Sequence, residues 1–163
     1  MNINEDKKID ILLSALDERY KSIHTIRARI QDVCLWTLGI LLGASGWLIQ
    51  SNIFFNEFQQ AIYILGILIA FIALRFKYLE DLEKGFRSQQ RVAARLEKTL
   101  GFFKPNEFNN SEEPIYPKDW ENCGTEDGRG NFFSTTYTLL YIGIIFLIIA
   151  ILSKGCILKI SLF

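Results

Sequence analysis

Three long stretches without a charged side chain constrain this sequence most. No Asp, Glu, Lys or Arg occurs in residues 33–56, 58–74 or 130–153. Eighteen residues of α-helix rise about 27 Å, close to the hydrocarbon thickness of a bilayer. The segment TLLYIGIIFLIIAIL has no polar face to turn toward water. We therefore predict an all-α integral membrane protein with transmembrane helices at 33–50, 60–76 and 136–153. For 60–76, whose apolar centre is short, a buried core helix is the alternative.

The basic residues predict how the chain is oriented in the membrane. Of the eighteen Lys and Arg, six precede the first span and ten lie between Arg75 and Arg129, whereas none lies in the turn SNIFFNE. The positive-inside rule then assigns the N-terminus and the middle segment to the cytoplasm. No leading apolar run resembles a secretory signal. We expect a multi-pass protein of the bacterial inner (plasma) membrane.

Periodicity predicts helices on the cytoplasmic side as well. We divide the chain into a cytoplasmic amphipathic helix (1–32), a two-span hairpin (33–76), a cytoplasmic helix with a structured loop (77–135), the third span (136–153) and a tail (154–163). No Pro or Gly interrupts residues 2–38, so the first helix should enter the membrane unbroken. Gly101 should end the helix that follows the second span. Pro117 should open one helical turn in PKDWEN.

The two cytoplasmic helices carry apolar stripes that require a partner. The second stripe consists of Leu79, Leu82, Phe86, Gln89, Ala93, Leu96 and Leu100, at heptad spacing. One such pair of helices makes only half a bundle, and a neighbouring subunit is its simplest completion. We therefore predict a homo-oligomer with a cytoplasmic helical bundle, and membrane lipid as its other partner.

Neither the cysteines nor the glycines of the loop indicate a cofactor. Cys34, Cys123 and Cys156 share no metal-type spacing. The glycines at 124, 128 and 130 fit neither a dinucleotide fingerprint nor a phosphate loop, so we interpret them as turn residues. The sequence predicts no metal and no cofactor.

Small and weakly polar residues gather in the first span, within TLGILLGASGWLIQ. Gly39 and Gly43 form a G-x-x-x-G pair, followed by Ser45 and Gly46, with Thr37 before them and Gln50 after them. Small residues let helix backbones approach closely in lipid. Either this face packs within the chain, or it lies at a subunit interface or around a channel. Because no ionisable residue is deep in a span, a passive pore is favoured over an ion-coupled transporter.

The single histidine follows an arginine at the spacing found in one class of ribonuclease motif. Arg19 and His24 fit the Arg-x(4–6)-His pair of metal-independent HEPN ribonucleases. Arginine can stabilise a developing negative phosphate, and histidine can transfer protons near neutral pH. Five helical steps rotate about 140°, so on one straight helix the two side chains diverge. The alternatives are ion pairing of Arg19 with nearby acids, and packing of His24 between chains.

The layout resembles small membrane accessory proteins of type VI-B CRISPR systems, which carry a divergent HEPN-like signature, here Arg19-Tyr-Lys-Ser-Ile-His24. It is also similar to bacterial SLATT-type and related octameric membrane defence proteins. The resemblance implies a ring of eight subunits that forms a membrane pore. Such a pore would dissipate the membrane potential in antiphage defence, with an RNA-guided nuclease complex as functional partner. Arg19 and His24 would be the degenerate motif pair.

These observations predict an oligomeric membrane pore and keep two other functions open. One is a membrane-tethered ribonuclease that uses Arg19 and His24, which would make the protein an enzyme. The other is a structural membrane subunit without activity. The sequence does not decide whether the chain binds nucleic acid directly.

Overall fold

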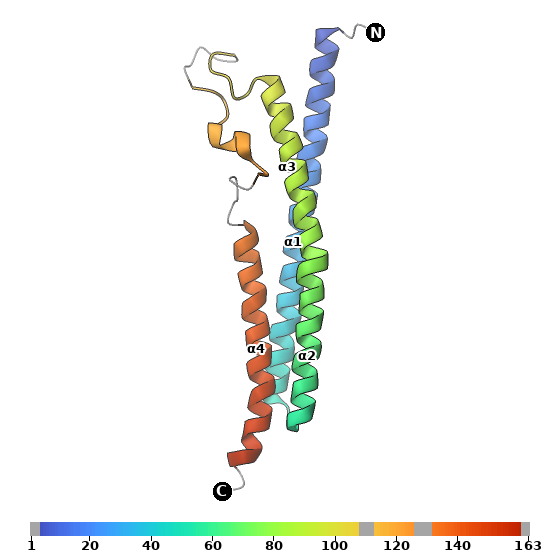
Figure 1. Ribbon diagram of the computed structural model, residues 1–163, viewed down its shortest axis with the longest axis vertical. Helices are drawn as coiled ribbons and strands as arrows, with labels where there is room; N and C mark the ends of the chain where they lie inside the picture. The colour runs from blue at the N-terminus through green and yellow to red at the C-terminus, as the bar shows by residue number, and fades with distance from the viewer. Residues whose placement is uncertain (1–3, 108–112, 126–131, 161–163) are drawn as a thin grey trace. The chain divides into compact units, whose positions relative to one another are not determined.

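The computed structural model describes residues 4–107, 113–125 and 132–160, with side chains up to residue 155. In chain order the helices are α1 (Glu5–Gln50), α2 (Glu57–Ala73), a π-helical segment (Leu74–Leu79), α3 (Glu80–Leu100), a 3-10 helix (Lys118–Asn122) and α4 (Phe132–Ile160) (Figure 1). No β-strand occurs in the described ranges. The prediction of an all-α protein is confirmed.

The ends of the helices follow from local sequence. α1 is unbroken, as predicted. α2 begins after a capping box, in which the Asn56 side chain accepts a hydrogen bond from the backbone N–H of Gln59 (2.7 Å) and the Gln59 side chain accepts one from the backbone N–H of Asn56 (3.1 Å). α3 ends at Leu100, because Gly101 takes a φ of 89° that favours glycine. The predicted turn after Pro117 is confirmed as the 3-10 helix.

Contacts divide the chain into two units. Unit 1 comprises Met1–Arg29 and Leu82–Gly130, and unit 2 comprises Ile30–Asp81 and Asn131–Phe163. α1 contributes to both units.

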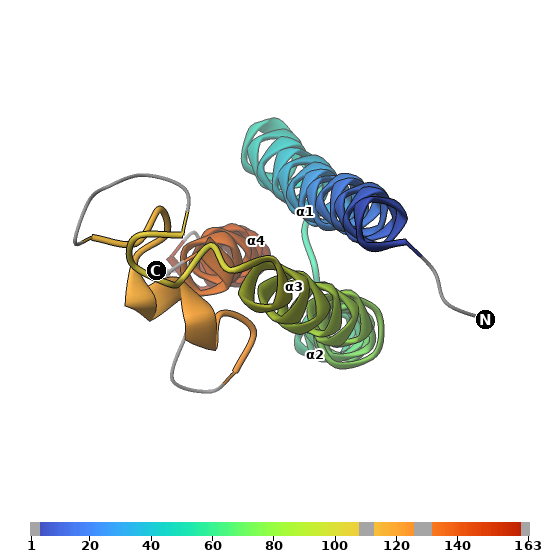
Figure 2. The same cartoon turned by 90° about the horizontal axis from the view of Figure 1, so that it is seen from above.

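Unit 2 is a bundle of the second part of α1, α2 and α4 (Figures 1 and 2). The apolar window of α4 is the most buried of the three. Its inner side chains repeat at alternating steps of three and four residues, the pattern of a coiled-coil seam. They are Tyr137, Leu140, Ile144, Leu147, Ile151 and Lys154. Leu48 of α1 joins this core, with Ile64 and Ile67 of α2 packed against it.

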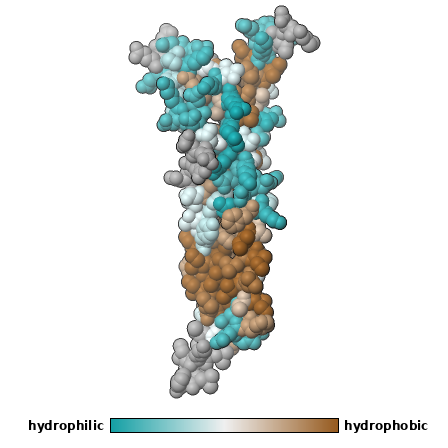
Figure 3. Space-filling model, in the orientation of Figure 1, coloured by the Kyte–Doolittle hydropathy of each residue, from teal (hydrophilic) through white to brown (hydrophobic). Residues whose placement is uncertain are grey.

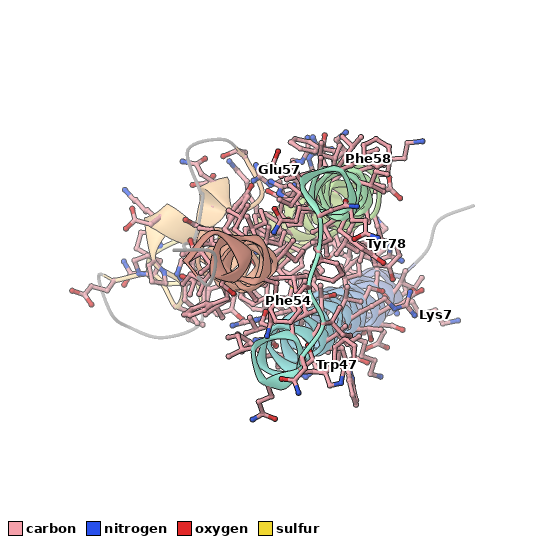
Figure 4. The ribbon with its side chains drawn as sticks, turned by 90° about the horizontal axis from the view of Figure 1, so that it is seen from below. Lys7, Trp47, Phe54, Glu57, Phe58 and Tyr78 are labelled. Atoms are coloured by element: carbon pink, nitrogen blue, oxygen red, sulfur yellow. The ribbon has the colours of Figure 1, made fainter. Side chains whose placement is uncertain are left out.

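The outer surface of unit 2 is apolar. Within the described residues, three helices are long and apolar enough to cross a membrane, in Glu5–Gln50, Glu57–Leu100 and Phe132–Gly155. Their most apolar windows are 17%, 6% and 44% buried, so the first two present most of their hydrophobic side chains outward. Figure 3 shows these side chains as a hydrophobic band. Figure 4 shows Trp47 of α1 and Phe58 of α2 turned away from α4.

A buried lysine satisfies the open end of α1. The last carbonyl groups of a helix have no partner in their own helix. The Lys154 ammonium, on a side chain only 6% exposed, donates to the carbonyl oxygens of Ile49 (3.0 Å) and Ser51 (2.5 Å). A cation at a helix C-terminus also interacts favourably with the helix dipole.

Replacing Lys154 with methionine should therefore destabilise the protein. We expect a loss of about 1–3 kcal/mol in unfolding free energy, because the carbonyl oxygens of Ile49 and Ser51 lose a charged donor. Thermal unfolding of the protein in detergent measures this loss. The matched control is Lys7→Met at an exposed position. Equal stability of the two variants would contradict the capping role.

Candidate functional site

The structure does not bring Arg19 and His24 together within one chain. The Arg19 guanidinium donates to Oε1 of Gln89 (2.9 Å) and pairs with Glu18 (3.3 Å). His24 is exposed, one and a half turns further along the same unbroken helix. Five residues rotate about 140° around a helix, so the two side chains point in different directions. A shared phosphate would have to lie between two chains, and the ribonuclease role stays a prediction.

The small residues of the first span divide into two faces of α1. Ser45 is 4% exposed, and its hydroxyl donates to the Leu41 carbonyl oxygen (2.6 Å). Thr37 lines a pocket of about 170 Å³ between α1, α2 and α4, together with apolar side chains such as Ile67 and Ile144. Thr37 and Ser45 therefore belong to the packing of unit 2.

The opposite face of α1 has no partner among the described residues. A Cβ added at Gly39, Gly43 or Gly46 would meet nothing within 4 Å outside its own helix. At about 100° per residue, the three glycines lie within about 60° of each other and about half a turn from Leu48. Gln50 is exposed on the same side. We call Gly39, Gly43, Gly46 and Gln50 the glycine face.

Large side chains border the glycine face. Trp36 is 76% exposed and Trp47 61%, and Leu42 lies on the other flank at 44%. The glycine face thus combines positions without side chains with large exposed apolar side chains beside them. Small residues between large ones are the surface that a second apolar helix can approach closely in lipid.

Arg75 sits in the π-helical segment at the edge of the apolar part of α2. Its guanidinium carbon lies 3.8 Å from the ring centroid of Tyr137 on α4, a cation–π contact. Its buried Nε has no hydrogen-bond partner among the described residues. The contact joins the end of α2 to the beginning of α4, and π-helical turns frequently mark functional positions.

Unit 1 contains a pocket around a buried carboxylate. The pocket has a volume of about 180 Å³ and lies between α1, α3 and the loop that carries the 3-10 helix. Glu97 of α3 is 7% exposed and accepts a hydrogen bond from the Tyr20 hydroxyl of α1. The other lining residues that matter here are Gln90, Ala93, Trp120 and Cys123. We call this site the Glu97 pocket.

The loop that closes the Glu97 pocket is held by aromatic stacking and one glycine. The Tyr116 ring stacks against Phe102 (5.2 Å) and Trp120 (5.5 Å). Glu121 pairs with Lys98 of α3. Gly124 has a φ of 81°, and a Cβ there would lie 2.6 Å from the Arg87 carbonyl oxygen of α3. Only glycine therefore lets the loop approach the helix this closely.

Burial and neighbouring groups raise the pKa of two side chains in the Glu97 pocket. Burial, followed by hydrogen bonds with Glu97 and Tyr116, raises the pKa of Tyr20 above its ordinary value. Burial, followed by the negative charge of Glu97, raises the pKa of Cys123. The thiol is thus kept protonated, the unreactive form. Among the described residues, no three His, Cys, Asp or Glu side chains are grouped to hold a metal ion.

Comparison with protein-family models, curated proteins and solved structures finds no match.

Sequence reasoning missed the Glu97 pocket. Glu97 lies four residues after Ala93 and three before Leu100, so it shares the side of α3 that carries the apolar stripe. An acidic residue at such a position could have indicated a buried carboxylate. Tyr20, Trp120 and Cys123 come from distant parts of the sequence, and no spacing links them to Glu97.

Proposed function

We propose that this protein assembles into a homo-oligomeric membrane pore, with unit 2 in the bilayer and unit 1 in the cytoplasm. The observation that carries the proposal is the glycine face, which is exposed in the apolar part of α1 and points away from the packing core of unit 2. Helices in lipid associate through close packing of small residues. A second copy of the same apolar surface is the partner that lipid surroundings favour.

A passive pore accounts for the chemistry of the spans. Residues 33–56 carry no charge that could couple transport to ions. Gln50 gives the glycine face a polar end, and glycines along it leave space for water when copies surround a common axis. The distribution of Lys and Arg supports a cytoplasmic N-terminus. The bacterial inner membrane is the location that we propose.

We further propose an antiphage setting for this pore. The proposal rests on the resemblance in layout to membrane accessory proteins of type VI-B CRISPR systems and to SLATT-type proteins. Opening would dissipate the membrane potential once a partner, such as an RNA-guided nuclease complex, has recognised its target. The octameric ring that the resemblance implies is part of the same proposal.

Leakage from liposomes tests the pore. We expect the purified full-length protein to release a small entrapped dye in proportion to the number of protein molecules per vesicle. Retention of a large dextran in the same vesicles would separate a pore of defined width from general lysis. Vesicles that stay sealed to ions and dye at all protein densities would contradict the proposal.

The same purified protein can be used to distinguish the pore function from the ribonuclease function. His24 is exposed on unit 1, where RNA can reach it. A ribonuclease would cleave single-stranded RNA, and Arg19→Ala and His24→Ala would each abolish the cleavage. The pore proposal predicts unchanged dye release in both variants. Cleavage that depends on His24, together with sealed vesicles, would favour the enzyme.

A further inference from the structure

We infer that the Glu97 pocket binds an organic cation, an ammonium or guanidinium group, between the Glu97 carboxylate and the rings of Tyr20 and Trp120. The inference concerns unit 1 alone and does not depend on the pore. The group can belong to a free amine or to a Lys or Arg side chain, and the test below distinguishes these sources.

Glu97 is a buried carboxylate whose hydrogen-bonding capacity is only partly used. Buried carboxylates are normally paired with a cation, because losing hydration costs several kcal/mol per ion. Within the described chain, the recorded donor to Glu97 is the Tyr20 hydroxyl, and no ion pair is recorded there. Lys98, the next residue, pairs with Glu121 instead. A carboxylate offers about four acceptor positions, so capacity is left for a donor that enters from the pocket.

The size and lining of the pocket suit a cationic group. Its volume of about 180 Å³ exceeds what one water needs, and it opens beside Trp120, which is 52% exposed. The aromatic rings of Tyr20 and Trp120 line the pocket together with the Glu97 carboxylate. A cation near an aromatic ring is attracted by the electrons of the ring face, most strongly for tryptophan. An aromatic wall with one carboxylate is a recognition site for an organic cation.

The lining also argues against other ligands. An anion would be repelled by Glu97. A transition metal would find one carboxylate and the protonated thiol of Cys123, fewer ligands than such ions require. Gln90 can donate or accept a hydrogen bond, so it can help to orient a planar guanidinium.

Protection of the Cys123 thiol tests the inference. We would measure the alkylation rate of Cys123 by peptide mass spectrometry, on the full-length protein in detergent. Butylamine and butylguanidine are the free cations, with butanol as the neutral control. The peptides Gly-Arg-Gly and Gly-Lys-Gly test the side-chain source, with Gly-Gln-Gly as their control. We expect saturable protection by the cations and none by the neutral compounds.

The pattern of protection identifies the source. Protection by the butyl cations and not by the charged peptides indicates a free organic cation as ligand, whereas protection by the charged peptides indicates that the pocket accepts a Lys or Arg side chain. Equal protection by butanol and butylamine would overturn the inference, and so would the absence of protection by every charged probe. Both results can be obtained with the natural protein, without any variant.

Two variants locate the charge that binds. Glu97→Gln keeps the shape of the side chain and removes its charge, so we expect about tenfold weaker protection or more. Asp119→Asn neutralises an exposed acid in the 3-10 helix and should leave protection unchanged. Because loss of the Glu97 charge also lowers the pKa of Cys123, protection is measured as the ratio of the alkylation rates with and without probe. Trypsin cleavage at Lys118 at the rate of the natural protein shows that the pocket of each variant is intact. Undiminished protection in an intact Glu97→Gln protein would contradict the inference.

Discussion

If copies associate through the glycine face as proposed, replacing Gly43 with leucine should weaken their association. Gly43 lies in the middle of the glycine face, and a Cβ there meets no other part of the described chain. The monomer can therefore accept the larger side chain, whereas a helix packed against this face cannot. An overpacked contact costs about 1–3 kcal/mol, which weakens association about 5- to 150-fold at each interface. Chemical cross-linking in lipid nanodiscs and dye release should both fall.

Gly66→Leu is the matched control for this variant. Gly66 lies in the apolar part of α2, and a Cβ there also meets nothing within 4 Å. The same change in volume and hydrophobicity is thus made on a different helix face. We expect Gly66→Leu to keep the cross-linked species and the dye release. If Gly43→Leu also keeps both, the glycine face is not the contact between copies.

Replacing Gly124 with alanine should release the loop from α3. The residue has a φ of 81°, which costs a non-glycine residue about 1–2 kcal/mol. The new Cβ would also lie 2.6 Å from the Arg87 carbonyl oxygen and 2.9 Å from the Arg91 backbone nitrogen. Both are backbone atoms that a rotamer change cannot move. We expect trypsin to cleave at Lys118 and alkylation of Cys123 to accelerate, each by about tenfold or more.

Gly85→Ala provides the comparison. Gly85 is inside α3, and a Cβ there meets nothing within 4 Å. Alanine in a helix interior is favoured over glycine by roughly 1 kcal/mol, so this variant should be as stable as the natural protein or more stable. Unchanged rates of cleavage and alkylation in Gly124→Ala would show that the loop does not need the close approach.

Features set by local chemistry could be predicted from the sequence. The absence of Pro and Gly before residue 39 predicted the unbroken α1, and Gly101 and Pro117 marked where α3 ends and the 3-10 helix begins. The apolar composition of the spans predicted three helices suited to a membrane. Each of these signals lies within a few neighbouring residues or within one run of hydrophobic side chains.

The packing faces of the spans could not be predicted in the same way. α4 is apolar all round, so hydrophobicity does not distinguish Leu140, which is buried, from Ile145, which is 56% exposed. The fit between side chains determines which side of α4 is buried, because Gly143 lets Leu38 and Leu41 of α1 pack against α4. The π-helical segment at 74–79 and the Glu97 pocket also arise from contacts between distant segments, which periodicity does not reveal.

The ammonium of Lys154 links the movements of α1 and α4. Because it holds the carbonyl oxygens of Ile49 and Ser51, the end of α1 cannot slide or turn relative to α4 without breaking a charged contact in a region that offers few substitutes. Gln60 of α2 adds a third attachment, since its amide donates to the Ile151 carbonyl oxygen (3.0 Å). Hydrogen bonds thus connect α1, α2 and α4 at one end of unit 2. If these hydrogen bonds persist during a rearrangement, the helices can only rotate about this end. The largest displacements in unit 2 would then occur at the opposite end, near Arg75.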